Sequence, residues 1–203
     1  GLVSFSRGTD TAGSGRVPAA FNNIVGLKPS RGLLSARGVV PACRSLDCIS
    51  IFANCAADAQ TVLDVAAGFD EQDPYSRDVA NVPAGASITP QGARVGVPKS
   101  ENLEFFGDEA AEKLFHDAVS RAKGLGASIV EVDLAPFLEA ARLLYEGPWV
   151  AERYVGIQEF FDAHPDAVHP VTREIIGGGA KPSAAEAFAA EYRMQALRRA
   201  VEP

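Results

Sequence analysis

Several residue types are scarce in this chain of 203 residues, and each scarcity excludes a class of protein. Lysine and arginine together number 19 against 26 acidic residues, which gives a formal net charge of -7. Nucleic-acid binding therefore has no electrostatic support. Charged residues also interrupt the apolar stretches well before the length of a membrane span. We expect neither a nucleic-acid partner nor a membrane partner.

Cysteine and histidine are too few and too scattered to indicate a metal centre. The cysteines, at Cys43, Cys48 and Cys55, have neither zinc-site spacing nor the spacing of a CxxC redox pair. The three histidines also lack the spacing of metal ligands. We expect no metal and no organic cofactor. An odd number of cysteines favours reduced thiols, mostly buried as small apolar side chains, in a cytoplasmic protein.

The residues that are abundant are typical of a folded globular protein. Hydrophobic residues make up 47% and charged residues 22% of the chain. The length is sufficient for one sizeable domain with a buried core, or for two small ones. The chain opens without an initiator methionine, on a predicted strand over 1–6, and stops directly after a helical pattern. We therefore expect it to be part of a longer polypeptide.

The first half of the chain alternates between loops and short regular elements. Residues 1–50 are rich in Gly, Ser, Pro and Arg, which favours short strands and tight loops. A helix is predicted over 58–68, where Asp58 is near the amino end and Gly68 is at the carboxyl end. Residues 69–92 are polar, rich in Pro and Gly, and are predicted to be a connection.

A strand, a helix and a second strand follow. The buried strand is predicted over 94–98, and the helix over 108–125 has apolar residues spaced three and four apart. Residues 128–134 alternate apolar and polar, as in a strand. Beyond 136 the pattern is mostly helical, with interruptions at Pro148, 164–165 and 177–179. This order predicts a βαβ-like unit and an α/β fold, with a mixed β-sheet surrounded by helices.

The segment from Gly8 to Pro18 (GTDTAGSGRVP) has the composition of a functional loop. Ser14 lies between two glycines, which permit a sharp turn and close approach of a substrate. Successive backbone N–H groups in such a loop can converge on an anion, and the oxygen of a tetrahedral intermediate would make that nest an oxyanion hole. Asp10 and Arg16 flank the loop and could pair to hold it. A plain turn remains an alternative; the phosphate-loop pattern and the GxSxG spacing are not met.

This segment, continued to Pro29, resembles the core signature of the amidase-signature family. The match extends through Arg31-Gly, Gly38-Val-Val-Pro41 and Ser45-Leu-Asp47, so it is nearly continuous over the first fifty residues. The resemblance implies a triad of Ser, a second Ser and Lys. It places the nucleophile at Ser14.

The same resemblance implies an oxyanion hole formed by the backbone N–H groups of Thr11, Ala12 and Gly13. The second Ser and the Lys of the family lie upstream of this signature, and neither element occurs in this sequence. Lys28 lies in a Gly-Leu-Lys-Pro element and does not correspond to the catalytic Lys. Asp47 is expected to tie down the loop around the site.

Two further segments resemble the allophanate hydrolase branch of the family. They are Phe21–Gly26 with Gly38–Cys48, and Leu143–Tyr154. The resemblance places Tyr145 and Arg153 against a substrate carboxylate, which a guanidinium can hold with two parallel hydrogen bonds. Without the family, ordinary surface positions for both residues are the more common arrangement.

The resemblance implies hydrolysis of a small amide, allophanate, during urea degradation, with release of ammonia. Residues 1–203 would be the central and later part of a single amidase-signature domain. We expect a homodimer acting on a small-molecule substrate. The alternatives are another amidase or an amidotransferase component of the same family, or a catalytically silent fragment that lacks the Lys and the second Ser.

Overall fold

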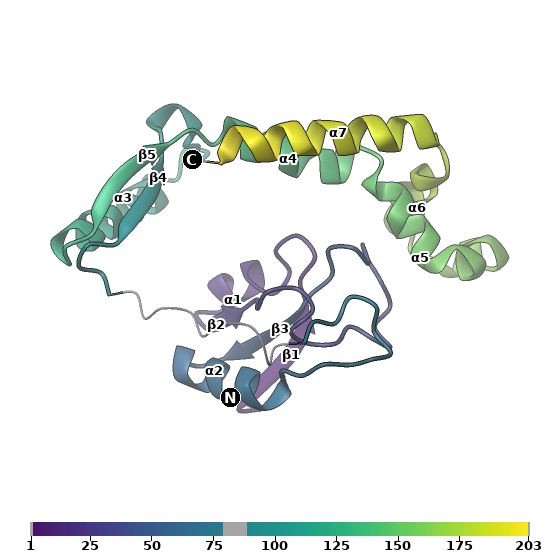
Figure 1. Ribbon diagram of the computed structural model, residues 1–203, viewed down its shortest axis with the longest axis horizontal. Helices are drawn as coiled ribbons and strands as arrows, with labels where there is room; N and C mark the ends of the chain where they lie inside the picture. Colours follow the sequence, from purple (N-terminus) through teal and green to yellow (C-terminus); the bar gives the residue numbers. More distant parts are fainter. Residues whose placement is uncertain (1, 79–88, 203) are drawn as a thin grey trace. The chain divides into compact units, whose positions relative to one another are not determined.

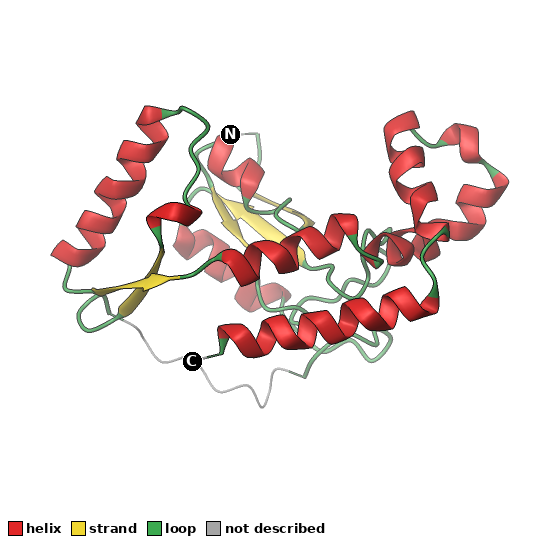
Figure 2. Cartoon of the chain, turned by 90° about the horizontal axis from the view of Figure 1, so that it is seen from above, coloured by secondary structure: helices red, strands yellow, loops and turns green. Residues whose placement is uncertain are grey.

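The computed structural model describes residues 2–78 and 89–202. They divide into two compact units. Of the described residues, the first unit contains 2–78 and 147–187. The second unit contains 89–146 and 188–202. Helices, red in Figure 2, outweigh strands, and strands pair both parallel and antiparallel. The predicted α/β class with mixed pairing is therefore confirmed.

An antiparallel sheet in the order β1-β3-β2 is the centre of the first unit (Figure 1). The strands are β1 (Phe5–Thr9), β2 (Val25–Leu27) and β3 (Ile49–Ala53). Helix α2 (Ala56–Ala66) packs on β3 and β2, and the short helix α1 (Val17–Phe21) packs on β2. The buried cluster contains Leu34, Ile51, Ala53 and Ala59. Apolar side chains on one face of the sheet and of α2 therefore form this core.

The boundaries of two elements in this unit differ from the prediction, and α2 ends at Ala66 rather than at Gly68. The first strand begins at Phe5, not at the start of the chain, and Gly1 lies outside the described residues. Its ends are set by pairing with β3, from Phe5↔Ala53 to Thr9↔Ile49. Helix α2 begins two residues before Asp58 because the Cys55 side chain caps it. The polar connection is described only in part, because 79–88 lie outside the described residues.

The βαβ unit predicted from the sequence is confirmed in the second unit. Strands β4 (Arg94–Pro98) and β5 (Ser128–Val132) are parallel, with Val95 opposite Ile129, and α3 (Glu109–Gly124) connects them (Figure 1). Asp108 caps α3 by accepting the amide of Ala111. Helix α4 (Ala135–Glu146) also belongs to this unit, and its Glu139 forms an ion pair with Arg193 of α7 (Ala184–Val201).

The remaining helices are interrupted where the sequence predicts. Helix α5 (Trp149–Ala163) begins after Pro148, and α6 (Pro170–Gly177) follows a short turn over Pro165–Ala167. A second short turn, Gly178–Ala180, precedes α7. Within the part of the chain that the structure describes, no helix has both the length and the apolar character needed to cross a bilayer.

Candidate active site

Two neighbouring strands position the loop that contains Ser14. The loop leaves the end of β1, and the amide of Asp10 continues the strand ladder by donating to the Cys48 carbonyl at 2.8 Å. The loop ends in α1, where the amides of Arg16 and Val17 donate to the Gly13 carbonyl at 2.9 and 2.8 Å. Ser14 is exposed at the turn between these anchors.

The carboxylate of Asp10 holds the loop from inside. It is fully buried, and it accepts Arg16 Nε at 2.8 Å, Arg16 Nη2 at 3.0 Å and the Gly15 amide at 3.1 Å. The Arg16 side chain and then the Gly15 amide lower the pKa of Asp10, against the effect of burial. The predicted pairing of Asp10 with Arg16 is confirmed, and it stabilises the turn that presents Ser14.

Glycine at position 15 allows the loop to lie directly on the sheet. A Cβ atom at Gly15 would lie 2.5 Å from the Cβ of Ser50, a fully buried residue of β3. A Cβ atom at Gly26 of β2 would lie 2.7 Å from the Cβ of Ala19, and closer still to the Gly15 carbonyl oxygen. Neither position has room for a side chain, so both glycines fix how closely the loop approaches the strands.

A second carboxylate holds the loop from the other side. The Thr11 hydroxyl donates to Asp47, which also accepts the amides of Ala42 at 3.0 Å and Cys43 at 3.1 Å. Asp47 is buried, and it therefore ties Thr11 to the segment after residue 41, as the sequence predicts. Among the described residues, the structure gives no acceptor for the amides of Thr11 and Ala12.

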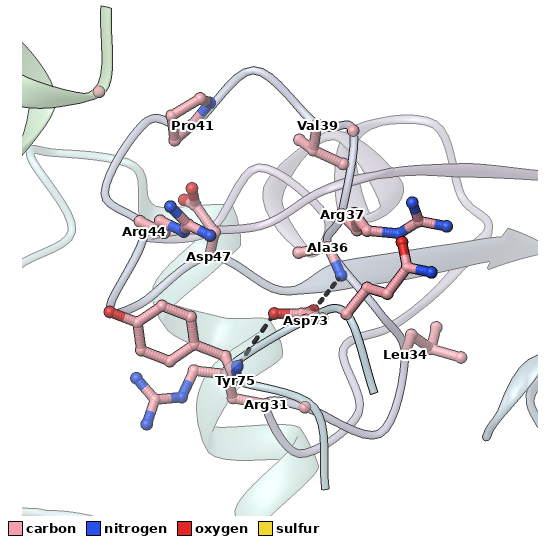
Figure 3. Close-up of a pocket in the computed structure, with 14 residues that line it drawn as sticks. Arg31, Leu34, Ala36, Arg37, Val39, Pro41, Arg44, Asp47, Asp73 and Tyr75 are labelled. Carbon is pink, nitrogen blue, oxygen red and sulfur yellow. Dashed lines mark hydrogen bonds between the residues drawn. The ribbon is translucent and has the colours of Figure 1, made fainter. Parts of the chain in front are cut away.

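A polar cavity of about 290 Å³ lies on the other side of Asp47 (Figure 3). The guanidinium carbons of Arg31 and Arg44 lie 5.3 and 5.9 Å from the centre of the Tyr75 ring. Asp73 accepts two backbone amides there, at 2.8 and 3.0 Å, drawn as dashed lines in Figure 3. Among the described residues that line the cavity, Ser14 is not included. The cavity lining contains three arginines, Arg31, Arg37 and Arg44, and two aspartates, Asp47 and Asp73.

The structure places the two predicted substrate-binding residues in different units. Tyr145 is in α4 of the second unit and is 63% exposed. Arg153 is in α5 of the first unit, is half-buried, and its positive charge acts on the Cys43 thiol. A shared role at a substrate carboxylate stays a prediction for this pair.

Sequence reasoning missed Glu152, which contacts the segment held by Asp47. Glu152 accepts the Ser45 amide at 2.5 Å, the Ser45 hydroxyl at 2.6 Å and the Cys43 thiol at 3.0 Å. More than one hundred residues separate these partners in the sequence, and no spacing rule connects them. Burial and then Glu152 raise the pKa of Cys43 to about 12.

Of the three cysteines, Cys43 and Cys48 are buried, as expected for small apolar side chains, whereas Cys55 is exposed. Burial also raises the pKa of Cys48. Within residues 2–78 and 89–202, no group of three or more His, Cys, Asp or Glu side chains is arranged to hold a metal ion.

Comparisons with known proteins place the chain in a family. The family model Amidase matches residues 1–202. Urea amidolyase of Saccharomyces cerevisiae is 44% identical over 97% of the chain, which spans 11% of that protein. A component of the glutamyl-tRNA(Gln) amidotransferase of Methanosarcina barkeri is 39% identical over 71% of the chain and 30% of that protein.

A solved structure gives the same result. A variant of Kluyveromyces lactis allophanate hydrolase has a TM-score of 0.89 and 43% identity, over 99% of this chain and 33% of that one. The chain therefore spans a third or less of these relatives. Since the family model covers almost every residue, and the loop around Ser14 has the geometry described above, the chain belongs to the amidase family.

Proposed function

We propose that the protein containing this chain hydrolyses allophanate during urea degradation, with Ser14 as nucleophile. The chain is similar to urea amidolyase and to allophanate hydrolase over almost its whole length. The observation that supports a catalytic role most directly is the loop itself. Two buried carboxylates hold it, Asp10 at Gly15 and Asp47 at Thr11, while Ser14 stays exposed. We also propose that residues 1–203 are the central and later part of one amidase domain.

The proposed reaction proceeds through an acyl-enzyme. A base removes the proton of the Ser14 hydroxyl, and Oγ attacks the amide carbon. The backbone N–H groups from Thr11 to Ser14 stabilise the negative oxygen of the tetrahedral intermediate. The C–N bond then breaks, the leaving nitrogen takes a proton, and ammonia departs. Water hydrolyses the remaining ester and regenerates Ser14. The resemblance assigns the base to a Lys acting through a second Ser, on a part of the family fold that this sequence does not contain.

Substrate choice is proposed to depend on Tyr145 and Arg153. Allophanate is small and offers little apolar surface, so polar contacts must supply most of the selectivity. A guanidinium recognises a carboxylate with two parallel hydrogen bonds, and a phenol adds one more donor. Arg153 directly follows Glu152 in α5, and the contacts of Glu152 with Ser45 support a fixed position for this turn of the helix.

The test is ammonia release from allophanate by the complete enzyme, beside its Ser14→Ala variant and a panel of simple amides. Turnover of allophanate that is abolished in the variant supports nucleophile and substrate together. Turnover of the simple amides instead would support Ser14 as nucleophile but reject allophanate as the substrate. That result would favour the second candidate function, another amidase activity of the family. That candidate is kept because the amidotransferase component is 39% identical over much of the chain.

A further inference from the structure

We propose that Glu152 is a positioning residue that holds the helix of Arg153 in register with the loop of Ser14. The inference rests on the proposed function, because it assigns Arg153 to the substrate carboxylate. It adds a residue that neither the family signature nor the predicted substrate pair includes.

Glu152 contacts residues 43–45 through three hydrogen bonds. Both of its carboxylate oxygens are used: Oε1 accepts the Ser45 amide at 2.5 Å, and Oε2 accepts the Ser45 hydroxyl at 2.6 Å and the Cys43 thiol at 3.0 Å. Hydrogen bonds to a charged acceptor are shorter and stronger than neutral ones. Three of them on one side chain fix the first turn of α5 against residues 43–45.

Asp47 holds the same segment as Glu152. Asp47 accepts the amides of Ala42 and Cys43, and it also accepts the Thr11 hydroxyl in the loop that contains Ser14. Cys43 is fully buried and Asp47 nearly so, which excludes water from the middle of this arrangement. A continuous set of hydrogen bonds therefore runs from Glu152, through Ser45 and Cys43, to Asp47 and Thr11.

Arg153 follows Glu152 directly in α5. Consecutive helical residues point about 100° apart, so one can be held by the protein while its neighbour faces elsewhere. Any shift of the first turn of α5 moves Arg153 relative to the loop of Ser14. Misplacement of a substrate-binding group by about 1 Å can reduce catalytic efficiency by about 100-fold. Glu152 thus acts on the substrate through Arg153.

A double-mutant cycle in the complete enzyme tests this coupling. Glu152→Ala is expected to reduce kcat/KM for allophanate by about tenfold or more, mainly through KM, because a contact to the bound substrate is weakened. Glu152→Gln keeps an acceptor for the Ser45 amide and is expected to recover most of that loss. In an Arg153→Ala background, Glu152→Ala is expected to have almost no further effect, since effects that act through one group are not additive.

Two controls separate positioning from folding. The rate at which an uncharged serine-directed phosphonate labels Ser14 is expected to stay within about twofold in Glu152→Ala, because that reaction does not use Arg153. Glu159→Ala, which removes an exposed carboxylate from the same helix, is expected to leave kcat/KM unchanged.

Additive losses in the cycle would overturn the inference while leaving the proposed function intact. An equal loss of labelling and of allophanate turnover in Glu152→Ala would also overturn it, since that result indicates a structural role alone. If the wild-type enzyme does not hydrolyse allophanate, the proposed function fails first, and the inference fails with it.

Discussion

The guanidinium of Arg16 holds the carboxylate of Asp10 through two hydrogen bonds, from Nε to Oδ2 at 2.8 Å and from Nη2 to Oδ1 at 3.0 Å. Asp10 is fully buried, whereas the Arg16 side chain is 54% exposed. The pair therefore joins the two ends of the Ser14 loop. Removal of the Arg16 side chain would leave the buried Asp10 carboxylate without its cation.

Arg16→Ala is expected to reduce the free energy of unfolding by about 1–3 kcal/mol, because a buried charged acceptor loses its donors. The same variant should label at Ser14 about tenfold more slowly, since the turn is no longer held. Denaturant unfolding and phosphonate labelling measure the two effects. Arg7→Ala, at an exposed position of β1, is the matched control, and an equal effect there would contradict the role of Arg16.

The effect of Arg16 should depend on pH. The pKa of Asp10 is lowered in the folded protein, so the stabilisation is fully present above the ordinary Asp pKa of about 3.9 and is lost as pH falls through the folded value. The difference in unfolding free energy between wild type and Arg16→Ala should therefore shrink below about pH 4. A difference that stays constant between pH 7 and pH 3 would show that Asp10 is not the responsible group.

Gly15→Ala is expected to disturb the loop because the new Cβ would overlap Ser50 in β3. Overpacking of this kind costs about 1–3 kcal/mol, and the labelling of Ser14 should slow with it. Ser50→Gly in the same chain should restore part of both losses by making room. Gly68→Ala is the control, since a Cβ at Gly68 meets open space.

Arg153→Lys tests the substrate assignment while keeping the positive charge. A lysine ammonium cannot form the two parallel hydrogen bonds of a guanidinium, so KM for allophanate should rise about tenfold with kcat changed less. Tyr145→Phe should raise KM by a smaller factor because it removes one donor. Arg198→Lys, at an exposed position of α7, should leave KM unchanged. Unchanged KM and kcat in Arg153→Lys would reject a bidentate contact.

Cys43 should resist alkylation although thiols ordinarily begin to ionise near pH 8.5. Burial first, and then Glu152, raise its pKa to about 12, so the reactive thiolate is scarce until far higher pH. Iodoacetamide at pH 8.5, followed by peptide mass spectrometry, should modify the exposed Cys55 well before Cys43.

The raised pKa of Cys43 also predicts how stability depends on pH. Its contribution to stability is fully present below the ordinary thiol pKa of about 8.5. It is lost as pH rises from there towards the folded value of about 12. Cys43→Ala should therefore flatten the alkaline decline in unfolding free energy.

Local patterns predicted the elements whose ends are determined by their own residues. Apolar spacing predicted the strand 94–98 and the helix 108–125, which the structure gives as Glu109–Gly124, while the strand expected over 128–134 ends at Val132. Boundaries that depend on partners were less predictable. The first strand was expected too early because pairing with β3 sets its ends, and α2 begins earlier because a cysteine, an unusual cap, starts it.

The same distinction applies to the site. Asp10 and Arg16 are six residues apart, and their pairing could be predicted from the sequence. The contact of Glu152 with Ser45 spans 107 residues, and only the folded chain brings them together. No property of Glu152 itself distinguishes it from the other acidic residues of α5. The family resemblance indicated Ser14 and an anchoring role for Asp47, but it did not indicate Glu152.

Gly26 lies so close to the Gly15 carbonyl that a Cβ atom there would overlap the oxygen, and this limits how the loop can change in evolution. Glycine is the smallest residue, so every substitution at Gly15 or Gly26 adds atoms where there is no room for them. Neighbouring exposed positions can exchange side chains of many sizes, whereas these two must stay constant or change together with the strands beneath them. Changes of side chain are therefore more accessible at the exposed positions of α5 than at these two glycines.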